Sequence, residues 1–166
     1  MSTLTSVLPH IDSLARQFDL QSRLFTNVTV GITDDHAHTR PNANTNNIAW
    51  LTGHTVSTRY MLANILGVQA AEPFPDLYAN GKGMSAEATY PSMTALLKDW
   101  AEISGKMMDR LRSMTEAELI ADAPMAMATG KRVIDFAAFI AHHEAYTIGQ
   151  LGILRRFFGY EAMKYN

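Results

Sequence analysis

Apolar residues recur at three- and four-residue steps along four long segments of this chain, which is the pattern of helices that bury one side. The four segments cover approximately residues 4–27, 45–67, 92–114 and 133–159. Between them the sequence is rich in proline, glycine, asparagine and aspartate, and it shows no sustained period. The pattern therefore predicts four long helices joined by connections of unequal length.

Residues of the capping type mark where several of these helices begin and end. Thr45 or Asn46 can cap the free backbone donors of the second helix, and Ser92 can cap those of the third. Gly67 follows the last periodic residue of the second helix, a position typical of glycine. Pro9 lies in the early turns of the first segment, where it favours a helix start at the residues beside it.

The connections predict different local structures. Residues 28–44 read as a long polar loop, and residues 68–91 as a second long connection that crosses one end of the bundle. The stretch 115–119 predicts a short helix with its own cap and an acidic start. Residues 125–132 are expected to be extended or to form a small turn at Thr129–Gly130.

Together these elements predict an all-α fold, a four-helix bundle with long connections after the first and second helices and a short extra helix before the fourth. At 166 residues the chain suits one domain, so we expect a single unit over residues 1–166. Gly149 and Gly152 interrupt the fourth helix and predict close approach of another helix, inside the bundle or across a dimer interface.

Composition and charge narrow the function classes. The chain has 47% hydrophobic and 18% charged residues, and its net charge of −2 provides no broad attraction for nucleic acid or anionic lipid. No apolar run approaches the roughly 20 residues that span a bilayer, and no signal-peptide pattern opens the sequence, so we expect a cytoplasmic protein. The chain contains no cysteine, so any thiol chemistry must come from a substrate.

Histidines in two of the predicted helices are candidate metal ligands. His54 lies in the middle of the second helix, beside an apolar stripe. His143 lies in the fourth helix, on the face that it shares with Thr147 and Gln150. Helices from distant parts of a chain can aim imidazoles into a shared bundle interior, although a lone histidine is more often a hydrogen-bonded core residue than a ligand.

The remaining candidates have weaker support. His142 shares its helix face with Tyr146, so His142 and His143 do not easily face one centre. His36 and His38 lie in the polar loop, where solvated side chains are favoured over a chelating pair. A substrate entrance could be lined by Asp76, Tyr78, Lys82 and Tyr90, but nothing in the sequence selects them. The methionines at 93, 107, 108, 114, 125 and 127 are interpreted as core filling rather than as a pocket wall.

Two motifs resemble the DinB-like superfamily, which includes the YfiT group of metal-dependent enzymes. The first is the run 46–54 with Arg40-Pro41 ahead of it, and the second is the run 143–151 followed by residues 154–156. The motifs occur in the right order and at suitable spacing, so the resemblance spans essentially the whole chain. It implies an antiparallel-type four-helix bundle, often a homodimer, that holds a divalent metal through three histidines.

The resemblance also implies which residues hold the metal. One ligand lies in the second helix and two lie at positions i and i+4 in the fourth. His54 matches the first and His143 the second, but Thr147 stands at the third. Zinc and nickel bind imidazole far better than a hydroxyl, so the ligand set is one short. Gln150, a loop histidine or a bound substrate could complete it.

Two functions follow from this. The resemblance implies a thiol-dependent transferase or hydrolase in which zinc or nickel activates the thiol of a low-molecular-weight cofactor. Thr147 would then hold a water near the metal, and Tyr146 or Gln150 would orient a small-molecule substrate. The alternative is a non-catalytic dimeric bundle that binds a small ligand or a protein partner without metal. DNA binding is not supported, because the sequence contains no basic stripe and no recognisable DNA-reading motif.

Overall fold

A computed structural model describes residues 9–78 and 81–165 of the chain. Four long helices dominate it: α1 (Pro9–Thr29), α3 (Ile48–Ile65), α5 (Met93–Ser113) and α7 (Val133–Phe157). The shorter elements are α2 (Asp34–His38), α4 (Pro75–Tyr78), α6 (Glu116–Ile120), β1 (Asp122–Met127) and β2 (Gly130–Arg132). The predicted four long helices and the short helix before the last are therefore confirmed.

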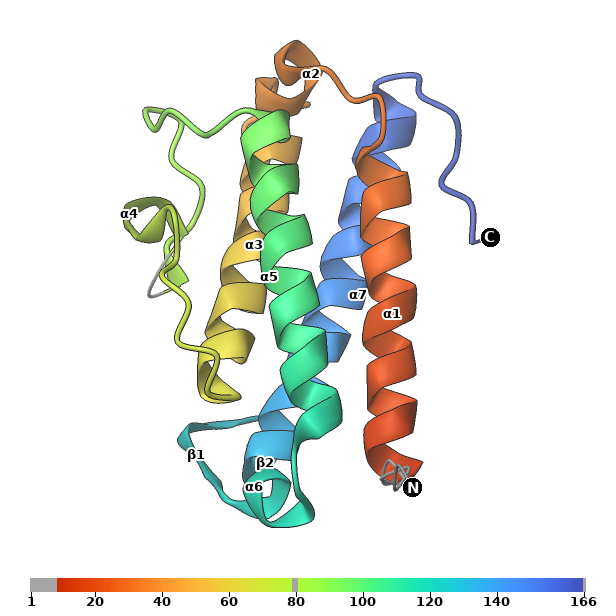
Figure 1. The fold of residues 1–166 in the computed structure, drawn as a ribbon. Coiled ribbons are helices and arrows are strands. Elements are labelled where there is room, and N and C mark those ends of the chain that lie inside the picture. Colours follow the sequence, from red (N-terminus) through yellow and green to blue (C-terminus); the bar gives the residue numbers. More distant parts are fainter. Residues whose placement is uncertain (1–8, 79–80, 166) are drawn as a thin grey trace.

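The four long helices pack side by side as a bundle (Figure 1). α3 packs mainly on α5 and α7, and α1 packs on the same two helices, so α1 and α3 lie diagonally across the bundle. α1 and α7 run in one direction and α3 and α5 in the other (Figure 1). α3 and α5 are thus parallel neighbours, which requires the long connection between them to return along the bundle.

Capping side chains explain most of the helix boundaries. The side chain of Asn47 accepts from the backbone N–H of Trp50 at 2.8 Å, so α3 begins slightly later than the predicted caps at 45 and 46. Ser92 caps α5 as predicted, and Gly67 follows α3 with a φ of 97°. α1 begins at Pro9, and the part of the predicted first helix before Pro9 lies outside the described residues.

Short elements occupy the segments that were predicted as loops. α2 interrupts the predicted loop 28–44, with Thr33 as its N-cap, and α4 interrupts the connection 68–91. Helices of four or five residues are too short to show a hydrophobic period, which is why the sequence pattern missed them. α6 is present as predicted, with Thr115 as its cap.

A small hairpin adds to the helices that the sequence predicted. β1 and β2 pair antiparallel through the turn at 128–129, with an irregular register between Asp122 and Met127. This segment was expected to be extended or a turn, and the fold is accordingly mostly helical rather than helical throughout. The hairpin lies at the end of the bundle where α7 begins (Figure 1).

The core lies between the four long helices. Six methionines were interpreted as core filling, and four of them are buried there, at positions 93, 107, 108 and 114. Met125 is 51% exposed, so the core interpretation is wrong for it, whereas Met127 packs against the core and also lines a cavity. No helix within the described ranges is long and apolar enough to cross a membrane.

A buried ion pair links all four long helices. Arg59 of α3 donates from Nε to Oε1 of Glu144 at 2.6 Å and from Nη2 to Oε2 at 2.5 Å, and both side chains are fully buried. The Nη1 group of Arg59 also donates to Ser22 of α1 at 3.0 Å and to Ser104 of α5 at 3.1 Å. The guanidinium stacks on the ring of Trp100 with its carbon 4.0 Å from the centroid.

Candidate functional site

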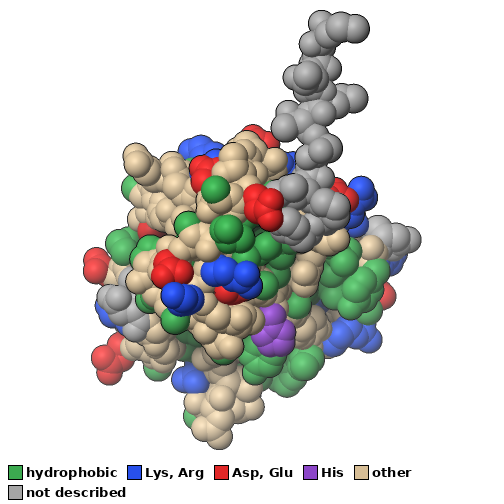
Figure 2. Space-filling model, turned by 90° about the horizontal axis from the view of Figure 1, so that it is seen from below, with side chains coloured by type: hydrophobic (Ala, Val, Ile, Leu, Met, Phe, Trp, Pro, Cys, Tyr) green, Lys and Arg blue, Asp and Glu red, His purple; other side chains and the backbone are tan. Residues whose placement is uncertain are grey.

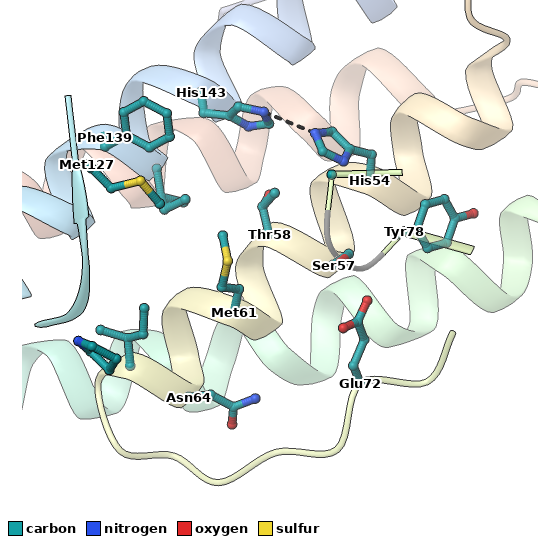
Figure 3. A pocket seen from close by; sticks show the side chains of 14 residues that line it. His54, Ser57, Thr58, Met61, Asn64, Glu72, Tyr78, Met127, Phe139 and His143 are labelled. Carbon is teal, nitrogen blue, oxygen red and sulfur yellow. Dashed lines mark hydrogen bonds between the residues drawn. The ribbon is translucent and has the colours of Figure 1, made fainter. Parts of the chain in front are cut away.

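His54 and His143 meet between α3 and α7. Their Nε2 atoms are 3.0 Å apart, and the ring planes make an angle of 64° (Figure 3). Two imidazole nitrogens bound to one tetrahedral zinc at about 2.0–2.1 Å lie about 3.3 Å from each other. The observed spacing is therefore close to that of two ligands of a single metal ion, and equally allows an N–H···N hydrogen bond between neutral rings.

Packing holds both rings in place and keeps them uncharged. His54 stacks on Trp50, one turn earlier in α3, with the ring centroids 4.8 Å apart and the planes at 7°. Burial lowers the pKa of His54 to about 4, and His143 acts in the same direction. Burial also lowers the pKa of His143, with His142 adding to the effect. Both imidazoles are therefore neutral near pH 7, the form that binds metals.

The Nδ1 atoms of the two rings are buried and have no hydrogen-bond partner among the described residues. In most protein metal sites the second nitrogen of a ligating histidine donates to a carboxylate or a carbonyl group, which fixes the ring. Here the stack on Trp50 orients the His54 ring instead, and the His143 ring lies edge-on to it. The pair thus fits two ligand positions by spacing and protonation, but without the usual outer hydrogen bonds.

Thr147 does not supply a third ligand. It is buried one turn after His143, and its hydroxyl donates to the carbonyl oxygen of His143 at 3.0 Å. That bond satisfies the hydroxyl within the helix itself. Within the described part of the chain, no group of three His, Cys, Asp or Glu side chains is arranged to hold a metal ion. The described residues therefore bring together two candidate ligands, His54 and His143.

The other residues proposed for the site lie elsewhere. Tyr146 is 66% exposed on the outer side of α7, and His142 is also exposed. Gln150 lines a separate cavity of about 240 Å³ between α7 and the segment before α3. The structure thus brings His54 and His143 together and leaves Tyr146 and Gln150 away from them.

The two loop histidines make structural contacts. The Nδ1 atom of His36 is 2.7 Å from the hydroxyl of Tyr160, and the ring stacks on Phe158. His38 is bonded through Nδ1 to the carbonyl of Asp34 and through Nε2 to that of Tyr90. Because both ring nitrogens of His38 are in use, it is not simply solvated, as the sequence suggested, and it is not free to complete a metal site.

A cavity of about 790 Å³ opens beside the histidine pair, between α3, α7, β1 and the connection that follows α3 (Figure 3). Most of the wall area is apolar, with polar side chains interspersed in it, as is typical of small-molecule sites. The lining residues are His54, Ser57, Thr58, Met61, Asn64, Ile65, Glu72, Tyr78, Gly81, Pro124, Met127, Phe139, Ile140 and His143.

Tyr78 closes one side of the cavity by packing directly on α3. Its ring lies against Gly53, and a Cβ atom at that position would overlap the ring and its hydroxyl. Burial raises the pKa of Tyr78 well above its usual range, so the phenol stays neutral. A glycine inside a helix, directly before a candidate ligand, was the available sequence signal for this contact.

Sequence reasoning missed most of the cavity wall. Glu72 lies in a connection without period, and Pro124 and Met127 lie in the hairpin. Among the four residues suggested for a substrate entrance, Tyr78 does line this cavity, whereas Tyr90 lines a different one of about 300 Å³. Segments without periodicity give no indication of which side chains face inward.

Comparison with known proteins agrees with this architecture. A crystal structure of a conserved protein from Enterococcus faecalis matches with a TM-score of 0.67 and 14% identity, over 87% of this chain and 94% of that chain. A DinB-like protein from Bacillus subtilis matches with a TM-score of 0.66 and 18% identity, over 92% of this chain and 96% of that chain. No curated protein sequence matches. Residues 17–151 match the DinB superfamily, and the chain therefore belongs to that superfamily.

Proposed function

We propose that this protein is a metal-dependent enzyme of the thiol-dependent transferase or hydrolase type, with His54 and His143 as the two protein ligands of one zinc or nickel ion. The observation that carries the proposal is the 3.0 Å separation of the two Nε2 atoms at the wall of a large cavity. Low pKa values support it, because neutral imidazoles bind metal without first losing a proton.

The missing third ligand has a consequence for the substrate. A four-coordinate ion held by two imidazoles leaves two positions for other donors, where catalytic zinc sites usually leave one. A bound divalent ion would supply a Lewis acid that favours the thiolate form of a low-molecular-weight thiol. The chain has no cysteine that could compete for such a position. The described residues of the cavity wall would exclude water and hold the organic part of the substrate.

The second candidate is a binding protein that uses no metal. It is favoured by Thr147, whose hydroxyl is satisfied within the helix, and by the unpartnered Nδ1 atoms of both histidines. In that case His54 and His143 share one hydrogen bond as neutral rings, and the cavity holds a small ligand. Metal content separates the two candidates directly.

The first test is elemental mass spectrometry on the untagged protein, expressed with zinc and nickel available. We expect close to one metal ion per chain, and loss of that metal in the double variant His54→Ala, His143→Ala. A His142→Ala variant removes a neighbouring histidine that is exposed, and it should keep the metal. A metal-free protein under all conditions would contradict the proposal and favour the second candidate.

Replacement of Thr147 by histidine tests whether the scaffold keeps the geometry of a three-ligand site. Thr147 is one turn from His143 on the same helix face, so Thr147→His places a third imidazole beside the pair. We expect zinc affinity to rise at least about tenfold, measured by competition with a chelating dye. Tyr146→His adds an imidazole on the exposed side and should give no rise.

We also propose that two copies of the chain associate through α7. Its outer face carries Tyr146, Ile153 and Phe157 at helical spacing, and all three are more than half exposed. Gly149 lies among them, and a Cβ atom added there would meet nothing within 4 Å. The glycine is therefore not explained by packing inside the bundle, and it would let a second helix approach closely.

A further inference from the structure

Glu72 is the single acidic or basic side chain, histidines aside, in the described wall of the main cavity. It lies in the connection after α3, and its carboxylate points toward α3 near Ser57 (Figure 3). The rest of the lining is neutral and largely apolar. The cavity thus has one fixed negative charge and no Lys or Arg in its described wall to balance it.

The carboxylate of Glu72 has no hydrogen-bond or ion-pair partner among the described residues. Its Oε1 atom is buried and without a hydrogen bond, and Glu72 makes no ion pair within the part of the chain that the structure describes. The sequence at positions 1–8, 79–80 and 166 contains no Lys or Arg either. Glu72 as a whole is only partly buried, and Oε1 is its shielded oxygen. A shielded carboxylate oxygen without a partner among the described residues can accept a hydrogen bond from a ligand that enters the cavity.

A metal ion is not that group. Glu72 does not combine with His54 and His143 into a three-ligand cluster, since the described side chains form no such cluster. In Figure 3 the histidine pair and Glu72 lie on different sides of the cavity. One molecule that fills the cavity can therefore meet the imidazoles with one part and the carboxylate with another.

We propose that the ligand of this cavity carries a primary ammonium group that binds Glu72, joined to an apolar body. An ammonium supplies three donors and the opposite charge, which the unpaired carboxylate lacks. Ser57 and Asn64 line the same cavity and can accept the remaining N–H groups. Met61 and Phe139 provide apolar wall for the body of the ligand. The inference rests on the proposed use of this cavity as the substrate pocket, but not on the metal.

The test compares two probes that differ only at one end, hexylamine and hexan-1-ol. Isothermal titration calorimetry at pH 7.5, with and without EDTA, measures the affinity of each for the full chain. We expect hexylamine to bind about tenfold more tightly, since hydrogen bonds to charged groups contribute about 1.5 kcal/mol or more. In Glu72→Gln the preference should vanish while the affinity for hexan-1-ol stays unchanged.

Glu87→Gln is the matched control, because Glu87 lies in the same connection but is exposed and outside the cavity wall. It should keep the full preference for the amine. Equal binding of the two probes to the wild-type protein would overturn the inference, and so would a preference that survives Glu72→Gln. Failure of both probes to bind would overturn it as well. Metal content is measured separately, so a metal-free protein that still prefers the amine defeats only the metal proposal.

Discussion

At the scale of single residues, the contact between Gly53 and Tyr78 controls one side of the cavity. Since a Cβ atom at position 53 would overlap the Tyr78 ring, Gly53→Ala should displace that ring and the connection that carries it. We expect the free energy of unfolding to fall by about 1–3 kcal/mol, the usual cost of overpacking, as measured by urea denaturation.

Gly105→Ala provides the control for this substitution. Gly105 lies in the interior of α5, is exposed, and leaves open space where a Cβ atom would stand. Alanine there should raise the free energy of unfolding by about 0.5–1 kcal/mol, because it lowers the backbone entropy of the unfolded chain. Equal effects of the two substitutions would show that Tyr78 moves aside at no cost.

Which site residues the sequence could reveal depended on where they lie. His54 and His143 could be predicted because both lie in helices with a clear period, and because the surrounding motifs resemble a known family. Glu72 could not, and Tyr78 was only one of four unselected candidates for a substrate entrance, since a connection without period does not indicate which side chains turn inward. Thr147 was predicted to lie on the same helix face as His143. Its bond to the His143 carbonyl depends on the rotamer of the Thr147 side chain, which residue spacing does not specify.

At the scale of elements, α6 depends on a charged cap. Glu118 bonds the backbone N–H of Thr115 at 2.8 Å and its hydroxyl at 2.9 Å, and it pairs with Arg110 of α5 at 2.6 Å. The Thr115 backbone bond, followed by the Arg110 side chain, lowers the pKa of Glu118 to about 2. Because the folded-state pKa lies below the unfolded one, this stabilisation is complete above about pH 5 and is lost as the pH falls toward 2.

Glu118→Gln should therefore lower the melting temperature at pH 7 and have a smaller effect near pH 2.5, where the wild-type carboxylate begins to be protonated. Circular dichroism melts at the two pH values measure this difference. Glu116→Gln, two residues earlier in the same helix, removes a carboxylate that makes no hydrogen bond or ion pair with the described residues. A difference that does not depend on pH would contradict the role assigned to Glu118.

The elements that the sequence missed are short or irregular. The long helices show several turns of period, and their caps at Ser92 and Thr115 have recognisable chemistry. α2 and α4 have only five and four residues, so no period develops. β1 contains a proline and alternates poorly between buried and exposed positions, and a strand of that kind is defined by its partner rather than by its own sequence.

At the scale of the whole molecule, the Arg59–Glu144 pair holds the bundle together. Glu144→Gln leaves a buried guanidinium without its countercharge, and we expect a loss of about 3–5 kcal/mol in the free energy of unfolding. The double variant Arg59→Met, Glu144→Leu removes both charges and should cost less than Glu144→Gln alone. Urea denaturation of the three proteins gives the comparison.

The exposed pair of Arg112 and Asp19 is the control, because it also joins two long helices, at 2.6 Å, but lies in solvent. Asp19→Asn should change the free energy of unfolding by less than about 1 kcal/mol. If it cost as much as Glu144→Gln, burial would not be the reason for the importance of the Arg59 pair.

The proposed dimer is tested by light scattering coupled to size-exclusion chromatography. We expect twice the chain mass for the wild type and a monomer for Ile153→Glu, which places a charge in the exposed apolar face of α7. Ile120→Glu alters an exposed isoleucine of α6 and should leave the dimer intact. A monomeric wild type at all concentrations would exclude this interface.

Long-range arrangement was the part that the sequence revealed least. Arg59 and Glu144 are 85 residues apart, and neither position differs in type from the charges on the surface. The parallel course of α3 and α5 likewise depends on the path of the connection 66–92, which has no period. Both acidic and basic side chains are scattered over the face of the molecule seen in Figure 2, and the net charge of −2 gives no indication that one such pair lies inside.

The parallel stacking of Trp50 on His54 also gives the protein a built-in optical signal. The chain has two tryptophans, and the other one, Trp100, packs against Arg59 and Phe25 in the bundle core. We therefore expect emission from Trp50 to change when the imidazole beneath it is protonated or binds a ligand. Fluorescence of the unlabelled chain would then report on binding at the histidine pair, whatever the ligand is.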